Sequence, residues 1–249
     1  MQGGLNNHKN LNTNNSVSTD TINDNLVDYE SVYTLSNFYK RFYQCCSGVR
    51  WKTSTTQFEL GLICEAASAL CRIESGDYRA DGFVIFKLNE RGKTRDIAAL
   101  KIYDRGVQKV LNQDILLPIY SRSFVEGNSA SIKGKGIDWA INFLEKQLHT
   151  HYDKYRNEGG IYVFDFSNYF GSLEHNTIKN DIQMYVSDKR SVKLLQDSVN
   201  DFRKLPTAYK DENNNYHGVG LGSEISQTFS LSYVNKLDHY MADLQDERV

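Results

Sequence analysis

The sequence lacks the patterns that mark several large classes of protein. Its four cysteines form no Cys-x-x-Cys pair and no Cys/His spacing typical of zinc, so a structural zinc site is not expected. No window is long and apolar enough to span a membrane, and the N-terminus has no apolar signal-peptide core. These absences predict a cytoplasmic protein with reduced thiols and no membrane association.

The overall charge does not single out a partner either. The formal net charge is −2, which gives no general attraction to nucleic acid. The stretch from Arg91 to Arg156 is locally basic, with twelve Lys and Arg against seven Asp and Glu. Such a stretch can face phosphates, but a solvated surface explains it equally well when charge is considered alone.

The spacing of apolar residues divides the chain into helical and extended segments. Eight of the first 25 residues are Asn, a composition that cannot bury enough apolar surface to fold, so residues 1–28 are predicted to be a disordered tail. Apolar runs at 83–86 and 97–100, joined by a basic turn at 89–93, predict a β-hairpin. Helical spacing predicts helices at residues 29–43, 58–73, around 107–115, 136–150, 172–186, 190–203 and from about 223 onward.

A continuous apolar run at residues 161–164 ends in Asp165, as expected of a buried strand. An acid in this position lies at the margin of a sheet, where it can meet a cation. Mg²⁺ prefers carboxylate and phosphate oxygens, and two-metal phosphoryl transfer uses such a carboxylate to hold ions about 4 Å apart. An Asp that merely caps the next helix is the simpler interpretation of this segment alone.

Three glycines alternate in residues 218–222, just before the last predicted helix. Glycine lets a backbone approach a ligand closely, and the N–H groups at a helix start favour anions. Ser223 is a good N-cap residue, with Ser226 and Gln227 in the first turn. An ordinary glycine-rich loop explains the same pattern, and the spacing differs from that of a dinucleotide site.

Basic residues follow the turn of the predicted hairpin. Lys93 ends this turn and Arg95 follows it, and Asp104, Arg105 and Gln108 come next in the chain. Arg and Lys near a hairpin tip can hold a triphosphate. Plain surface charge is the alternative interpretation of these residues.

Taken together and in this order, the segments resemble the reverse transcriptases of bacteria, especially the retron, group II intron and phage-defence types. The resemblance covers about residues 30–249 and rests on four matches in order. The first two are Arg95 with Asp104-Arg105-x-x-Gln108, and a Gly-Lys-Gly-like run at the end of residues 129–136. The last two are Asp165 with Phe170 five residues later, and Gly218-x-x-x-Gly222-Ser223-x-x-Ser226. The resemblance implies an α+β fold of the right-hand polymerase type. Helical fingers with a β-hairpin would occupy residues 29–158, and part of a ferredoxin-like palm would occupy residues 159–249.

The resemblance also implies a role for individual residues. Asp165 would be the catalytic metal ligand, assisted by the backbone carbonyl of Phe166, for the two Mg²⁺ ions of a complete enzyme. Phe170 would be the gate that disfavours a 2′-hydroxyl on the incoming sugar. The remaining nucleotide contacts would come from Gly222, Ser223, Arg95, Lys93 and Lys101. The template and primer would lie along Ser131, Lys133, Lys135 and Gln227.

The sequence departs from the family in two places. No Asp-Asp pair occurs anywhere, so the Tyr-x-Asp-Asp motif of the family is missing, and Tyr240-Met241-Ala242-Asp243 falls within the last predicted helix. The residues before Gly222-Ser223 are Gly220-Leu221, where many relatives have Pro-Gln. One metal-binding Asp cannot hold two ions against phosphate repulsion. We therefore expect a fragment that ends before the third motif and is inactive alone.

Three functions remain compatible with the residues. The resemblance favours an RNA-directed DNA polymerase that acts on an RNA template, a DNA primer and dNTPs, with or without a dedicated structured RNA. A related polymerase that makes untemplated DNA, as some abortive-infection relatives do, is the second. A non-catalytic nucleic-acid-binding module that retains the fold is the third.

Overall fold

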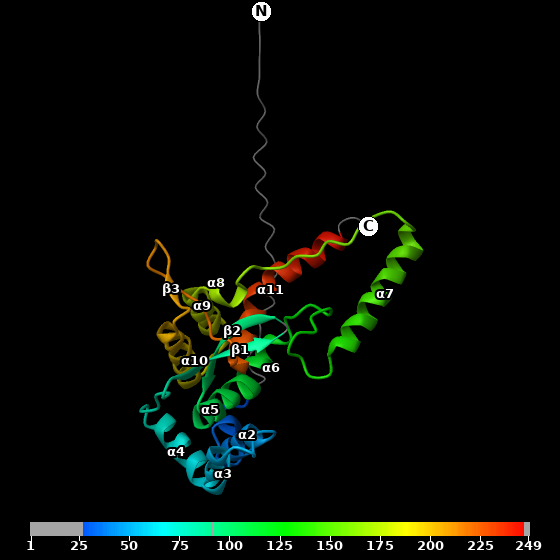
Figure 1. Cartoon of the computed structure of the whole chain (residues 1–249). Helices are drawn as coiled ribbons and strands as arrows, with labels where there is room; N and C mark the ends of the chain where they lie inside the picture. Colours follow the sequence, from blue (N-terminus) through cyan, green and yellow to red (C-terminus); the bar gives the residue numbers. More distant parts are fainter. Residues whose placement is uncertain (1–26, 91, 247–249) are drawn as a thin grey trace, which may run out of the picture.

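The computed structural model describes residues 27–90 and 92–246 (Figure 1). Most of the segment predicted to be a disordered tail, residues 1–26, lies outside the described residues, as does Arg91 in the hairpin turn. The last two residues of that predicted tail belong to the fold. Val27 is buried in the core, and the Asp28 side chain accepts a hydrogen bond from the Ser31 backbone N–H at the start of α1.

Four helices form the N-terminal part: α1 (Tyr29–Val32), α2 (Leu35–Cys46), α3 (Thr53–Leu60) and α4 (Leu62–Glu74). The helix predicted at 29–43 is divided in two. Thr34 adopts an extended backbone and its hydroxyl accepts from the Asn37 N–H, so a second helix begins there. Phe38 and Phe42 lie one turn apart on α2 and are fully buried, which anchors this helix to the core.

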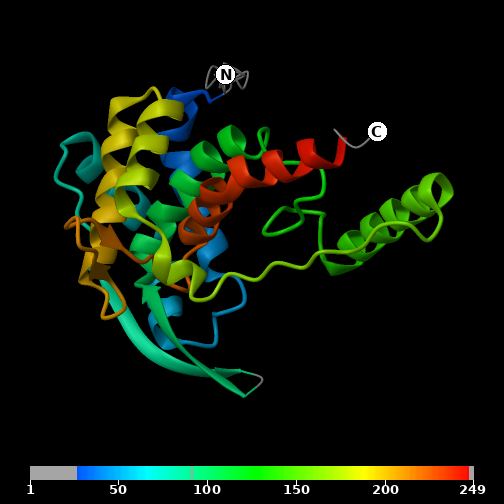
Figure 2. The same cartoon turned by 90° about the horizontal axis from the view of Figure 1, so that it is seen from above.

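The predicted hairpin is confirmed and is longer than expected. Strands β1 (Phe83–Glu90) and β2 (Lys93–Leu100) pair antiparallel, with Phe83 opposite Leu100 and Glu90 opposite Lys93. Only the end near Leu100 is buried, whereas the distal part projects from the molecule (Figure 2). The hairpin base therefore joins the core and its tip is exposed.

The helix predicted around 107–115 is part of a longer helical segment with a π-helical turn inside it. This segment consists of α5 (Ile102–Leu111), the π-helix η2 (Asn112–Leu116) and α6 (Leu117–Tyr120). Its apolar face, including Val107, Leu111 and Ile115, is buried as the spacing predicted. The π turn changes the direction of the side chains at Gln113 and Asp114. Gln113 contacts α11 and Asp114 contacts α2.

The second half of the chain is mostly helical, with a small hairpin and an irregular segment. It contains α7 (Ile137–Tyr155), α8 (Tyr169–Ser172), α9 (His175–Tyr185), α10 (Lys189–Asp201), the 3₁₀ turn η3 (Phe202–Lys204), strands β3 (Tyr209–Lys210) and β4 (Tyr216–His217), and α11 (Glu224–Asp246). The irregular segment lies between α7 and α8. The helices predicted at 136–150, 172–186, 190–203 and from about 223 are thereby confirmed, with shifted bounds. Residues 240–243 lie inside α11, as the sequence predicted.

Helix α7 stands away from the rest of the molecule in both views (Figures 1 and 2). None of its residues is buried, and its apolar stripe of Ile137, Ile141, Leu144 and Leu148 is exposed. By contrast, the first half of α11 passes through the core, where Ile225 and Phe229 are buried. Within residues 27–90 and 92–246, none of the helices combines the length and apolar character that crossing a bilayer requires.

The prediction of a buried strand at residues 161–164 is wrong. These residues form no strand, and Val163 is 87% exposed. A strand is stable when another strand satisfies its backbone groups, and no described segment pairs with this one. The described chain is thus α+β with two two-stranded sheets, and these residues assemble no ferredoxin-like sheet.

Candidate nucleotide and nucleic-acid site

The glycine run at residues 218–222 packs against the base of the β1–β2 hairpin. The Ala98 N–H donates a hydrogen bond of 2.9 Å to the Leu221 carbonyl. Gly222 has φ +110°, and a Cβ built on it would lie 2.9 Å from Cγ2 of Ile97. Only glycine meets both the backbone and the space requirement at this contact. The structure therefore brings the predicted glycine motif at 218–222 next to the hairpin strand that carries Arg95.

Ser223 is linked to the helix that follows the hairpin. Its hydroxyl donates to Oε1 of Gln108 on α5 over 2.7 Å, and both side chains are buried. The sequence predicted that Ser223 caps the last helix and lines a nucleotide pocket. In the structure Ser223 directly precedes α11 and its hydroxyl donates to Gln108, while Gly222 beside it is exposed. The capping and nucleotide-binding roles of Ser223 stay predictions.

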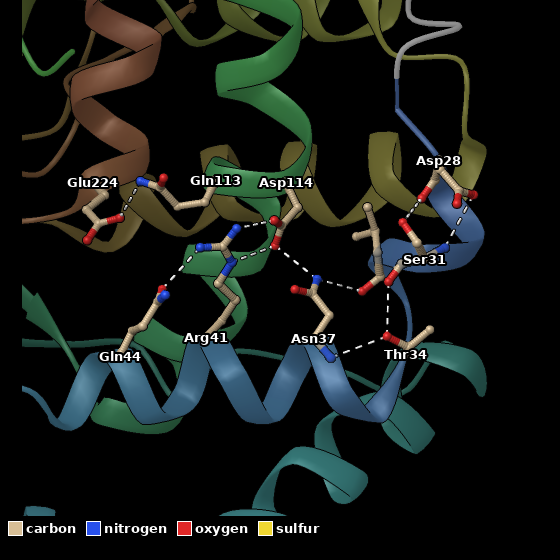
Figure 3. Close-up of polar contacts among 10 residues, drawn as sticks. Asp28, Ser31, Thr34, Asn37, Arg41, Gln44, Gln113, Asp114 and Glu224 are labelled. Atoms are coloured by element: carbon tan, nitrogen blue, oxygen red, sulfur yellow. Dashed lines mark hydrogen bonds and ion pairs between the residues drawn. The ribbon is translucent and has the colours of Figure 1, made fainter. Parts of the chain in front are cut away.

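An ion pair and a hydrogen bond fix the start of α11 beside this contact. Glu224 forms an ion pair with Lys109 and also accepts from Nε2 of Gln113 over 3.3 Å. Figure 3 shows that the neighbouring Asp114 reaches the other way, to Arg41 of α2. The π turn thus lets adjacent residues contact α11 on one side and α2 on the other. No sequence motif indicated these contacts.

Phe170 meets the glycine run through its backbone. The Val219 N–H donates to the Phe170 carbonyl over 2.9 Å, and the Gly218 N–H donates to the Leu173 carbonyl over 2.9 Å. The Phe170 side chain is partly buried and packs against the core. The aromatic residue predicted as a sugar gate therefore lies next to the loop predicted to hold the nucleotide.

His175 holds the same loop and was not identified from the sequence. Its Nε2 lies 2.7 Å from the Gly218 carbonyl, to which it donates, and the ring is fully buried. Burial lowers the pKa of His175, which keeps the ring neutral. A single histidine at a helix start carries no spacing signal, so only the fold reveals this contact.

Asp165 and Phe166 do not join this cluster in the way predicted. Both lie in the exposed, irregular segment before α8, so Asp165 does not end a buried strand. In the described part of the chain, no group of three or more His, Cys, Asp or Glu side chains is placed to hold a metal ion. Two Mg²⁺ ions were expected only in a complete enzyme, and that expectation stays a prediction; Asp165 itself is exposed.

The three predicted triphosphate contacts do not converge. Arg95 pairs with Glu90 on the neighbouring strand at 3.0 Å, and Lys101 pairs with Asp81 at 3.0 Å near the hairpin base. Lys93 is exposed at the hairpin tip. Both ion pairs are exposed to water, so replacing the carboxylate by an incoming phosphate would cost little free energy.

The segment predicted to follow the template lies against α11. The Ser131 hydroxyl donates to Oε1 of Gln227 over 3.1 Å, which joins two of the predicted template contacts. Lys135 donates to the Glu126 carbonyl over 2.7 Å and lies 4.4 Å above the Trp139 ring, whereas Lys133 is exposed. This segment and α7 line an open groove of about 530 Å³ that includes Ser131, Lys135, Ile137, Ile141 and Leu144.

Comparison of the chain with models of protein families gives no match, and comparison with curated proteins gives none either. The arrangement of the site therefore rests on the geometry of this chain. The exposed Gly222 lies where β2, α5, α8 and α11 meet. Each contact joins residues that are far apart in the sequence.

Proposed function

We propose that this chain is the fingers and part of the palm of an RNA-directed DNA polymerase of the bacterial reverse transcriptase type. The proposal rests on one observation. Three of the four segments that carry the sequence resemblance, around Ala98–Gln108, Phe170 and Gly218–Ser223, meet at a single loop. In the proposed protein, the fingers correspond to residues 29–158 and the palm to residues 159–249.

The chemistry of this loop suits a nucleotide. Gly222 is exposed and has no side chain, so a base and sugar can approach its backbone closely. Phe170 lies beside the loop and would exclude a 2′-hydroxyl by contact with the sugar. Arg95, Lys93 and Lys101 supply positive charge along the hairpin for a triphosphate.

The template and primer are assigned to the neighbouring surface. Ser131 and Gln227 form one edge of it, and Lys133 adds an exposed charge. Contacts of this kind position a phosphate backbone without reading its sequence. The open groove along α7 continues the same surface and can accommodate a strand.

Asp165 is the proposed catalytic carboxylate. Two Mg²⁺ ions need further acidic ligands between them, and the sequence has no Asp-Asp pair to supply these. We therefore propose that the 249-residue chain binds template, primer and nucleotide but does not extend the primer by itself.

The test uses a fluorescent DNA primer annealed to an RNA template. Dissociation of the purified chain is measured with Mg²⁺ and either the next complementary dNTP, a non-complementary dNTP or the matching ribonucleotide. We expect only the complementary dNTP to slow dissociation, and Phe170→Ala to make the ribonucleotide equally effective. Equal effects of all nucleotides on the unmodified chain would argue against templated synthesis.

A charge reversal tests the assigned template surface. The double variant Lys133→Glu/Lys135→Glu should weaken binding of the primer–template by about tenfold or more, because the positive groups near the backbone are reversed. Lys189→Glu/Lys193→Glu is the matched control, since these lysines are exposed on α10 and carry the same change in charge. An equal loss in both variants would reject the assignment.

Primer extension separates the remaining functions. The chain alone should give no product with four dNTPs and Mg²⁺, and product in that assay would contradict the proposed inactivity. Product made without a template would support the untemplated polymerase instead. Binding of nucleic acid without any nucleotide effect would favour a non-catalytic module.

A further inference from the structure

Three large aromatic side chains are exposed together around the end of α2. Tyr39 and Tyr43 lie one helical turn apart on its outer face, 43% and 46% exposed. Trp51, in the loop that follows α2, is 79% exposed. Single exposed aromatic residues are common, but a stacked exposed pair with a third exposed ring in the following loop indicates a contact surface. We call Tyr39, Tyr43, Arg50 and Trp51 the tyrosine face.

The rings of this face are oriented before any ligand binds. The planes of Tyr39 and Tyr43 differ by only 12°, with centroids 6.5 Å apart. The Arg50 guanidinium lies 4.9 Å from the centroid of Tyr43, so a cation lies directly beside this pair of rings. Flat groups arranged in parallel offer stacking positions at low entropic cost, because the side chains are already ordered.

Arg50 is itself held in place by Glu59. Its Nε donates to both carboxylate oxygens of Glu59, at 2.9 and 2.8 Å, and Nη2 donates to Oε1 over 2.7 Å. These hydrogen bonds raise the pKa of Arg50, so the guanidinium keeps its charge. The contact with Glu59 fixes the plane of the guanidinium and leaves its face available beside Tyr43.

Unpaired positive charge surrounds the aromatic groups. Lys40 is exposed on α2 between the two tyrosines in sequence, and Lys52 lies 5.1 Å from the centroid of the Trp51 ring. Among the described residues, neither lysine forms an ion pair. The surface therefore combines exposed aromatic rings with two exposed lysines that can meet phosphates.

Aromatic rings interleaved with cations match single-stranded nucleic acid. Unpaired bases stack on aromatic faces, and the backbone follows the positive groups. A base-paired duplex conceals its base faces and would gain only the charge contacts. An apolar protein partner would gain nothing from Lys40 and Lys52. Charge and ring geometry therefore select one class of ligand.

We propose that the tyrosine face binds single-stranded nucleic acid, for which unstructured RNA serves as the probe, at a site separate from the glycine loop. Figure 1 shows α2, α3 and α4 at the end of the molecule opposite α7 and the C-terminal part of α11. A strand bound here is thus remote from the groove that α7 lines. The inference does not depend on polymerase activity, because the stacking surface has its own residues.

The test measures the affinity of the full chain for a labelled, unstructured 12-nucleotide RNA by fluorescence anisotropy. Stacking contributes about 1–3 kcal/mol per base, so Tyr39→Ala/Tyr43→Ala should raise Kd by about tenfold or more. Tyr39→Phe/Tyr43→Phe keeps the π faces and should bind within about twofold of the unmodified chain. Tyr240→Ala is the matched control, since this exposed tyrosine lies on α11.

Two further arms separate this site from the proposed template surface. Lys133→Glu/Lys135→Glu should leave a component of RNA binding that the tyrosine double variant removes. A blunt RNA duplex of the same sequence should bind more weakly than the single strand. Equal binding of duplex and single strand, or no loss in Tyr39→Ala/Tyr43→Ala, would overturn the proposal. A change in sedimentation with no change in RNA affinity would assign the face to self-association instead.

Discussion

The Ser223 hydroxyl donates a 2.7 Å hydrogen bond to the Gln108 amide oxygen, although 115 positions separate the two residues. Both are buried, so water cannot replace either partner if the other is removed. This contact ties the glycine loop to the helix that follows the hairpin. It makes the geometry of the loop depend on α5.

The first prediction concerns this hydrogen bond. Gln108→Leu leaves a buried hydroxyl without an acceptor and should lower the free energy of unfolding by about 1–3 kcal/mol. Adding Ser223→Ala to that variant should cost less than the sum of the two single changes, because no orphaned group remains. Urea denaturation followed by circular dichroism measures both effects. Strict additivity would show that the hydrogen bond does not couple these residues.

The second prediction concerns the packing of α5 on α2. A Cβ on Gly106 would lie 2.4 Å from Cδ1 of Phe42, whose ring is fully buried. Gly106→Ala should therefore destabilise the protein by about 1–3 kcal/mol through overpacking. Gly61→Ala is the matched control, since its nearest atom would be 3.9 Å away. Equal unfolding midpoints for the two variants would contradict this account.

The third prediction compares two ion pairs that differ in burial. The side chains of Arg41 and Asp114 are each 15% exposed, and Nε of Arg41 donates to Oδ2 of Asp114 over 2.9 Å (Figure 3). Asp114→Ala leaves the guanidinium without its partner and should cost about 2 kcal/mol or more. Glu59→Ala breaks the exposed pair with Arg50 and should shift the unfolding midpoint much less. A larger effect of Glu59→Ala would reverse this ranking.

The fourth prediction concerns the small hairpin next to the glycine run. Burial opposes a charge on His217, but hydrogen bonds to the Ser172 carbonyl and to Asp211 outweigh it and raise the pKa of His217 above 6.5. Because the folded pKa is the higher one, the stabilising effect is complete below about pH 6.5. It is lost as pH rises through the folded value.

Replacement of the acid tests this assignment. Asp211→Asn removes the negative partner, so the pKa of His217 should fall toward 6.5. A nuclear magnetic resonance titration of the His217 ring protons measures the change directly. The unmodified protein should also lose more stability than the variant between pH 6 and pH 8. An unchanged His217 pKa in Asp211→Asn would show that Asp211 does not contribute to the shift.

Local patterns anticipated most of the helices and the large hairpin. The apolar runs at residues 83–86 and 97–100, joined by a basic turn, predicted two strands, and the structure pairs them with each other. The same reasoning failed at residues 161–164. Four apolar residues in a row favour a strand, but they carry no information about whether a pairing segment exists.

The sequence also anticipated which segments form the candidate site, but not how they hold one another. It identified Phe170, Gly222 and Ser223 by order and spacing. It did not identify His175, and it gave no sign of the hydrogen bond from Ser223 to Gln108. Such contacts depend on the approach of distant elements, which a linear pattern does not record.

By itself, the sequence determined where helices form, where the chain turns and which residues resemble a polymerase. These features depend on neighbours within a few positions, through helical spacing, strand alternation and glycine geometry. Only the tertiary structure decided that the glycine loop rests on Ala98, Gln108 and Phe170, and that Asp165 lies in an exposed segment. The loop contacts depend on which buried polar groups find partners across the fold. The exposure of Asp165 depends on whether another segment packs against residues 161–166.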